Sequence, residues 1–169
     1  VIARNQKTFL YLKGLFQKHE VQKTYLALVW GRVKEKEGVI NKPISIKDGS
    51  VKRTVFKGKM TREAVTNYKV IKFFPPEADQ PGAEKFGFTL LEVMPKTGRT
   101  HQIRVHLSSI GHPVVGDKLY GKREATGKEQ IARQFLHAKK IEFKLQSGKL
   151  LSVEAPLSPE LQSFVHLLR

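Results

Sequence analysis

The spacing of apolar residues changes along the chain, and each change predicts a new element of secondary structure. Residues 5–20 carry apolar side chains at helical intervals, with Asn5 as the expected N-cap. The stripe that this predicted helix should bury is formed by Phe9, Leu10, Leu12 and Phe16. Residues 23–30 then alternate with a period of two and are apolar on both sides, which predicts a strand in the interior of a sheet.

Further strands are predicted where short apolar stretches lie between turn signals. Asp48-Gly49 predicts one hairpin turn and Ser147-Gly148 another, while the polar, proline-containing residues 75–82 predict a connection at the surface. The strands themselves are expected at residues 38–46, 51–57, 66–74, 86–94, 135–145 and 149–153.

Two more helices complete the predicted order of elements. Residues 100–110 should form a short helix closed by Gly111 and Pro113. Residues 159–169 should form a C-terminal helix with Ser158 as its N-cap. Because the strands mostly follow one another, we expect an α+β fold with a mixed, largely antiparallel β-sheet and a few flanking helices. A length of 169 residues fits a single domain, residues 1–169.

The net charge of the chain gives information about its binding partner. It has 31 Lys and Arg against 15 Asp and Glu, a formal net charge of +16. An excess of this size produces a positive potential that attracts phosphate backbones or anionic membranes. Nucleic acid is the partner that the charge favours, and a merely solvated basic surface is the alternative.

Composition also excludes several classes of function. The chain has no cysteine, so disulfides, thiol nucleophiles and thiolate metal sites are excluded, and its six histidines lack the spacing of a metal site. It has neither an apolar run of about 18 residues nor the pattern of a signal peptide. We therefore expect a cytoplasmic protein that binds no metal and no membrane.

The chemistry is concentrated between Lys96 and Gly121. In the predicted helix 100–110, His101 and Arg104 share a polar face, and Ile103 and Leu107 form the apolar one. An arginine beside a core-facing stripe is costly to leave unpaired, so Arg104 should meet a carboxylate or a phosphate in a fork geometry. For an isolated arginine, a structural ion pair is a simpler interpretation than a role in function.

Three groups of residues resemble motifs of one family. Residues 98–107, followed by 111–113 and 116–121, closely resemble the signature of the RluA family of RNA pseudouridine synthases. Residues 23–31 are similar to its tyrosine-bearing strand, and residues 135–138 to its late strand motif. The resemblance extends over essentially the whole chain, in the order of the family.

The resemblance implies the catalytic fold of these synthases, of which this chain would be the C-terminal portion, incomplete at the N-terminus. The implied reaction converts uridine into pseudouridine within RNA, ribosomal RNA more often than transfer RNA, after the nucleotide is flipped into a pocket. No cofactor or metal is implied, and we expect a monomer. A non-catalytic RNA-binding module is the alternative.

The resemblance also assigns roles to residues. Arg104 would pair with the nucleophilic aspartate, Tyr25 would stack on the flipped base and take part in removing the C5 proton, and Leu136 would pack near the base. A core tyrosine and a core leucine are the alternatives for the last two. Phosphate contacts are expected from Lys52, Arg53, Lys57, Arg99, Lys118 and Arg123, each of which could instead be a solvated charge.

The nucleophile itself is expected outside the chain. The family places it in a His-Arg-Leu-Asp motif before an apolar strand, of which only the ending, residues 1–3, is similar here. Asp48, Asp79 and Asp117 lie in other contexts, and Asp117 reads as a structural acceptor. We therefore expect the aspartate upstream of residue 1 and the chain alone to be inactive. The histidines His101, His106 and His137 are expected to be hydrogen-bonding scaffold.

Overall fold

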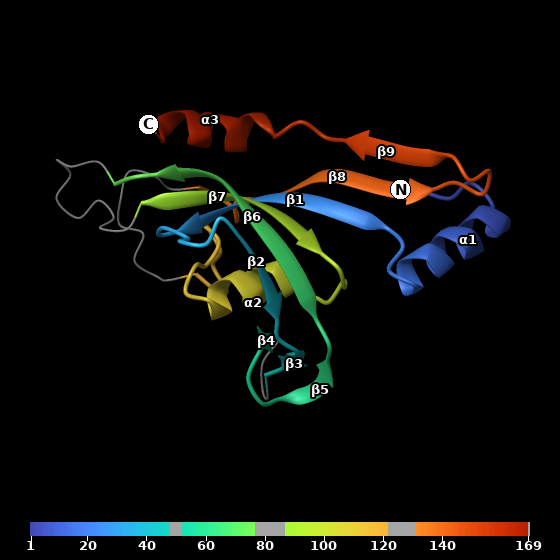
Figure 1. Ribbon diagram of the computed structural model, residues 1–169, viewed down its shortest axis with the longest axis horizontal. Coiled ribbons are helices and arrows are strands. Elements are labelled where there is room, and N and C mark those ends of the chain that lie inside the picture. Colours follow the sequence, from blue (N-terminus) through green and yellow to red (C-terminus); the bar gives the residue numbers. More distant parts are fainter. Residues whose placement is uncertain (48–51, 77–86, 122–130, 169) are drawn as a thin grey trace.

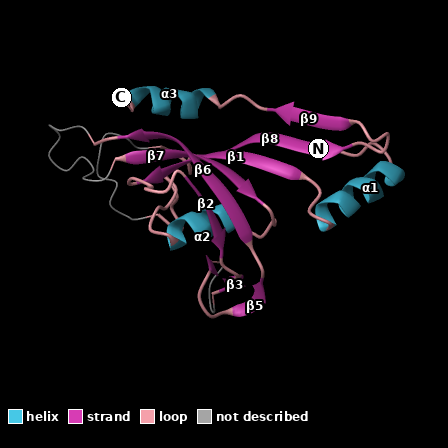
Figure 2. Ribbon diagram, viewed as in Figure 1, coloured by secondary structure: helices cyan, strands magenta, loops and turns pink. Residues whose placement is uncertain are grey.

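The computed structural model describes residues 1–47, 52–76, 87–121 and 131–168, and within these ranges two antiparallel sheets and three helices make up the fold (Figures 1 and 2). The main sheet has six strands in the spatial order β2 (Glu37–Asn41), β6 (Val65–Phe74), β7 (Phe88–Pro95), β1 (Gln22–Trp30), β8 (Leu136–Lys144) and β9 (Leu150–Glu154). The small sheet has the order β4 (Arg53–Thr54), β3 (Ile44–Ile46) and β5 (Lys59–Arg62). The helices are α1 (Gln6–Gln17), α2 (Gln102–Ser109) and α3 (Pro159–Leu167).

The interior strand predicted at residues 23–30 is confirmed as β1. It pairs with β7 on one side and with β8 on the other, both antiparallel. Ala27, Leu28 and Val29 are completely buried, as expected for consecutive residues of a strand that is covered on both faces. The predicted α+β class with a largely antiparallel sheet is also confirmed.

Helices α2 and α3 cover opposite faces of the main sheet (Figure 1). Tyr25 and Ala27 pair with Val93 and Leu91, so these four side chains share one face. Apolar residues of α2 join the same core on this face, and His106 of α2 reaches Thr66 of β6. On the other face, the ring of Phe135 lies 6.2 Å from that of Phe164 in α3.

The small sheet is anchored to α2 and lies beyond it in Figure 1. A buried cluster of Ile44, Ala64 and Val105 joins the sheet to the helix. The predicted single strand 38–46 is wrong, because it divides into β2 and β3 at Lys42-Pro43. Proline has no N–H for the ladder, and the chain passes from one sheet to the other there.

Helix α1 confirms its predicted start and corrects its predicted face. The Oδ1 atom of Asn5 accepts the Thr8 N–H at 2.9 Å, which is the expected cap. However, Phe9, Leu10 and Phe16 are each about half exposed, and Leu15 is the residue that the helix buries. Of the predicted stripe, Leu12 packs with Tyr11 and Leu15 against the cluster at the end of β8, so this part of the prediction is confirmed, whereas the other three residues face outward. It also ends at Gln17 rather than Glu20.

The predicted strand 51–57 is largely wrong, because only Arg53 and Thr54 form β4 and the chain turns from residue 55 on. The other element boundaries differ by smaller amounts. The second predicted helix begins at Gln102, because His101 has a φ of 58° and cannot continue a right-handed helix. The third has Pro159 at its first position as expected, but Ser158 makes no side-chain cap hydrogen bond. Strand β5 was not predicted, since all four of its residues are exposed and show no alternation. The Asp48-Gly49 turn and most of the 75–82 connection lie outside the described residues.

No helix in the described ranges has the length and apolar character needed to cross a membrane.

Two glycines offer a matched test of this packing. The ring of Tyr68 lies against Gly38, its cross-strand partner, where an added Cβ would come within 2.5 Å of the phenol oxygen. Gly38→Ala should therefore lower the free energy of unfolding by about 1–3 kcal/mol through overpacking. Gly14→Ala, in α1 with open space around it, should raise it by about 0.5–1 kcal/mol. Urea unfolding of both variants measures the difference, and equal stabilities would contradict the packing of Tyr68 on β2.

Candidate functional site around Arg104

A bidentate ion pair between Arg104 and Asp117 forms the centre of the site. The Nε and Nη2 atoms of Arg104 donate to the Oδ2 and Oδ1 atoms of Asp117, each at 2.7 Å. The Asp117 side chain is completely buried and that of Arg104 is 15% exposed. The prediction that Arg104 meets a carboxylate in a fork geometry is confirmed, and here the partner comes from within the chain.

Asp117 is held as an anion by groups on two sides. Besides Arg104, its Oδ1 atom accepts the backbone N–H groups of Leu119 at 2.9 Å and Tyr120 at 3.0 Å. Burial alone would raise the pKa of Asp117, but these hydrogen bonds and the charge of Arg104 together lower it below its ordinary value. The same pair raises the pKa of Arg104, against the opposing effect of burial. Asp117 is thus the structural acceptor that its sequence context indicated.

Tyr120 connects this ion pair to the small sheet. Its ring lies 5.1 Å from the Cζ atom of Arg104, within reach of a cation–π contact. Its hydroxyl accepts the Arg53 backbone N–H of β4 at 2.8 Å and forms a second hydrogen bond, 3.0 Å long, with the Nδ1 atom of His101. The sequence spacing did not indicate this link, because it depends on how β4 folds back towards α2.

A buried polar network fixes α2 on the main sheet. Gln102 donates to the carbonyl of Val65 and to the hydroxyl of Thr66, both at 3.0 Å, and accepts from the Thr97 hydroxyl at 2.7 Å. The Nε2 atom of His106 lies 2.9 Å from the Lys42 carbonyl and must donate, so its Nδ1 atom accepts from Thr66. With every partner satisfied, the network holds the helix that carries Arg104 in one position.

The three histidines make the hydrogen bonds expected of scaffold residues. Burial lowers the pKa of His106, and burial together with the charges of Arg104 and Arg53 lowers that of His101, so both rings are neutral at pH 7. His137 of β8 lies 3.0 Å from the Ala155 carbonyl through its Nε2 atom.

Tyr25 and Leu136 lie on the sheet face that α2 covers. Leu136 is the cross-strand partner of Ala27, two residues along β1 from Tyr25, so the two side chains are diagonal neighbours on adjacent strands. Both are partly buried against the main core. Burial raises the pKa of Tyr25, and its hydroxyl makes no hydrogen bond within the described residues. No hydrogen bond, ion pair or ring contact in that part of the chain joins either residue to Arg104.

Lys23 was not singled out from the sequence but occupies the same face. It precedes Tyr25 by two residues on β1, and a Cβ added at Gly98 would lie 3.7 Å from its Nζ atom. Burial lowers its pKa, and it forms no ion pair in the described ranges. A partly buried ammonium without a carboxylate beside Tyr25 is available to an anion.

The predicted phosphate-contact residues divide into two groups. Lys52, Arg53 and Lys57 lie on or beside the small sheet, whereas Arg99 precedes α2 and Lys118 follows Asp117 in the chain. The Nε atom of Arg99 donates to the carbonyl of Glu63 at 3.0 Å, so that side chain is already partly engaged. Arg123 lies outside the described residues.

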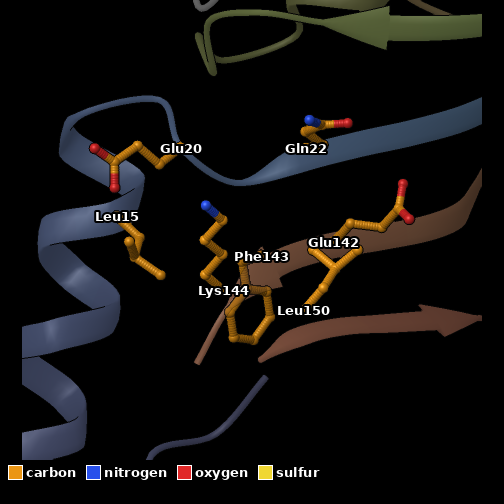
Figure 3. Close-up of a pocket in the computed structure, with 7 residues that line it drawn as sticks. All are labelled: Leu15, Glu20, Gln22, Glu142, Phe143, Lys144 and Leu150. Carbon is orange, nitrogen blue, oxygen red and sulfur yellow. The ribbon is translucent and has the colours of Figure 1, made fainter. Parts of the chain in front are cut away.

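A separate cavity of about 430 Å³ lies where α1 meets β1, β8 and β9 (Figure 3). It contains none of the predicted site residues, and its walls include Leu15, Phe143 and Leu150 with the carboxylates of Glu20 and Glu142. The described residues contain no group of three or more acidic or histidine side chains that could hold a metal ion.

Comparison with known proteins gives a consistent result. A family model described as RNA pseudouridylate synthase matches residues 1–109. The chain is 36% identical over 166 residues to an uncharacterised RNA pseudouridine synthase of Bacillus subtilis, covering 96% of this chain and 50% of that protein. It is 34% identical to the ribosomal large subunit pseudouridine synthase C of Vibrio vulnificus, covering 100% and 51%. The type D enzyme of Nitrosomonas europaea is 36% identical, with 100% and 47% covered. The chain thus spans about half the length of these relatives.

Solved structures show the same fold. Human RNA pseudouridylate synthase domain containing 1 superposes with a TM-score of 0.79 at 26% identity, covering 96% of this chain and 66% of that one. Domain containing 4, also human, shares the fold with a TM-score of 0.71 at 21% identity, covering 97% and 68%.

Replacing Asp117, the acid of the buried pair, should lower the stability of the fold. Asp117→Asn leaves Arg104 without its counter-ion, and we expect the free energy of unfolding at pH 7 to fall by about 3–5 kcal/mol. The folded pKa of Asp117 lies below its unfolded value, so its stabilisation is present above about pH 4 and is lost as pH falls through the folded pKa. The difference in the free energy of unfolding between Asp117→Asn and the wild type, measured by urea unfolding, should therefore become smaller below about pH 4.

Glu160→Gln provides the control for this experiment, because Glu160 forms an exposed pair with Arg133 at 3.5 Å. We expect little change in stability at any of these pH values. A pH-independent gap for Asp117→Asn would contradict the assigned ionisation of Asp117.

Proposed function

This chain belongs to the RNA pseudouridylate synthase family, and from that membership we propose that the complete protein isomerises specific uridines to pseudouridine in structured RNA. Ribosomal RNA is the proposed substrate, because two of the relatives are ribosomal large subunit pseudouridine synthases. The net charge of +16 supports a phosphate-rich partner. The observation that carries the proposal is the fixed orientation of Arg104 on α2.

The reaction breaks one bond to the ribose and forms another. The glycosidic bond between N1 and C1′ is broken, the base turns within the site, and C5 is joined to C1′. The proton lost from C5 is balanced by one that N1 gains. Atoms and electrons balance without an oxidant or a reductant, so we propose no cofactor. The uridine has to leave its stack first, at a cost of about a few kcal/mol that contacts to the RNA backbone must offset.

Arg104 is proposed to hold the nucleophilic carboxylate in its ionised form. Asp117 occupies its Nε and Nη2 atoms, and within the described residues Nη1 makes no hydrogen bond. The guanidinium is therefore oriented on one side and open on the other. A second carboxylate at about 4–6 Å from this cation would have its pKa lowered, which keeps it charged and nucleophilic at neutral pH.

Asp117 is not the proposed nucleophile. Both of its oxygens are engaged, by Arg104 and by the two backbone N–H groups, and its side chain has no exposure. Asp48 and Asp79 lie outside the described residues and outside the sequence context that the family requires. We propose that the nucleophile is an aspartate that is not among the 169 residues of this sequence.

Tyr25 and Leu136 are proposed to form the apolar wall against the flipped base. Their adjacent positions on the sheet, and a phenol oxygen with no partner in the described structure, support a role in contact with substrate. Because burial raises the pKa of Tyr25, the phenol is neutral at pH 7 and suited to stacking. The Tyr25 phenol is a weak base at pH 7, so we favour its stacking role over a role in removing the C5 proton.

The RNA backbone is proposed to cross the small sheet and the start of α2. Lys52, Arg53 and Lys57 would contact phosphates at the small sheet, and Arg99 and Lys118 would contact them before α2 and beside Asp117. Arg123 is proposed for the same role from its place in the sequence alone. Such contacts position the RNA without reading its sequence, so the choice of uridine depends on the shape of the RNA around it.

The role of Arg104 is tested by a substitution that keeps the charge. Arg104→Lys preserves a cation beside Asp117 but loses the fork, so we expect the fold and most RNA affinity to survive while pseudouridine formation is abolished. Mass spectrometry after chemical labelling of pseudouridine measures product, and thermal unfolding checks the fold. Arg32→Lys, an exposed arginine over the ring of Phe73, is the matched control. Normal turnover in Arg104→Lys would overturn the assigned role.

The absence of the nucleophile is tested with a polypeptide of these 169 residues. We expect it to bind RNA with an affinity that falls steeply as salt rises, because cations released from the RNA drive the binding. It should form no pseudouridine over long incubation. Detectable product would refute the proposed position of the nucleophile, whereas binding by an inactive complete protein would favour a non-catalytic RNA-binding module.

A further inference from the structure

We propose that Phe56, on the connection between β4 and β5, is a stacking platform for an unpaired nucleobase of the bound RNA. The proposal rests on the proposed function and adds a contact that reads the base face rather than the phosphate. Phe56 is 79% exposed, more than any other large aromatic side chain in the described structure. No ring or cation–π contact engages Phe56 within the described residues, and an exposed phenyl ring does not gain the free energy that burial would supply.

The backbone that carries Phe56 is held in place by contacts within the small sheet. The Phe56 N–H donates to the Thr54 hydroxyl at 3.1 Å, which closes the turn after β4. At Gly58 the chain passes so close to the carbonyl of Ile46 in β3 that a side chain there would clash with it. A short, tightly packed turn loses little conformational freedom when a base stacks on its tip.

The charge around Phe56 selects a nucleic acid as its occupant. Strands β3, β4 and β5 carry no acidic residue, and the exposed cation Lys57 directly follows Phe56 in the chain. The cations on or beside these strands are Lys47, Lys52, Arg53, Lys57, Lys59 and Arg62. An aromatic ring among cations is the arrangement by which single-stranded RNA is bound, with bases stacked on the ring and phosphates held beside it. Met60, 68% exposed, widens the apolar surface.

Phe56 is also coupled to the proposed active site. Arg53 of β4, three residues before Phe56, donates its backbone N–H to the Tyr120 hydroxyl, and the Tyr120 ring lies against Arg104. Ile44 and Val105 pack together beneath the sheet. A base stacked on Phe56 is therefore held in a fixed relation to Arg104, which suits a nucleotide near the uridine that reacts.

The test uses the complete protein and a short single-stranded RNA that carries one 2-aminopurine, whose fluorescence is quenched when it stacks. We expect quenching on binding to the wild type and its loss in Phe56→Ala. The affinity of Phe56→Ala should fall about 5- to 150-fold, the value of one base–aromatic stack. Phe56→Trp should restore both readouts. Because no charge changes, the slope of affinity against salt should stay that of the wild type.

Phe9→Ala is the matched control, since Phe9 is 49% exposed on the lysine-bearing helix α1, which lies away from the small sheet (Figure 1). We expect it to bind and quench like the wild type. Wild-type affinity and quenching in Phe56→Ala would overturn the inference, as would a loss of self-association in that variant, which would assign the ring to a contact between copies.

The outcomes also separate this inference from the function it rests on. A wild-type protein that forms pseudouridine, together with a Phe56→Ala variant that binds normally, would sink the stacking platform alone. A wild-type protein that neither binds the RNA nor forms pseudouridine would sink the proposed function.

Discussion

The buried ion pair of Arg104 and Asp117 is the interaction on which the rest of the site depends. A completely buried carboxylate is costly unless its charge is compensated, and here two guanidinium hydrogen bonds and two backbone N–H groups compensate it. Asp117 thereby ties the turn that follows α2 to the middle of the helix. The same turn carries Tyr120, whose hydroxyl accepts the Arg53 backbone N–H. The position of the ion pair therefore also determines where the small sheet is attached.

The position of α2 is determined by polar contacts as much as by apolar packing. Ile103 and Leu107 bury apolar surface against the sheet, but such packing tolerates small shifts along the helix. Gln102 and His106 do not, because their hydrogen bonds to Thr66, Val65 and the Lys42 carbonyl have fixed directions. A displaced α2 would leave several buried polar groups without partners, and this penalty keeps Arg104 in register with the sheet.

The proposed chemistry and the proposed recognition of RNA lie on two different sheets, which α2 connects. Tyr25 and Leu136 lie on central strands that are paired on both sides, where displacements are small. Phe56 and the surrounding cations lie on or beside the small sheet, which an apolar cluster and the Tyr120 hydroxyl connect to α2 and its following turn. The contacts that position Arg104 therefore also position the surface proposed to meet the RNA.

The sequence by itself determined the elements whose signals are local. Alternation identified β1 as an interior strand, Asn5 marked the start of α1, and an arginine beside an apolar stripe indicated a carboxylate or phosphate partner in a fork geometry. Tertiary structure decided what depends on distant segments: that α1 buries Leu15 and exposes Phe9, that the strand expected at residues 38–46 serves two sheets, and that Asp117 is the residue which meets Arg104. Spacing shows which side chains share a face, but the surface which covers that face comes from elsewhere in the chain. Burial and pairing are therefore settled only when the strands and helices pack together.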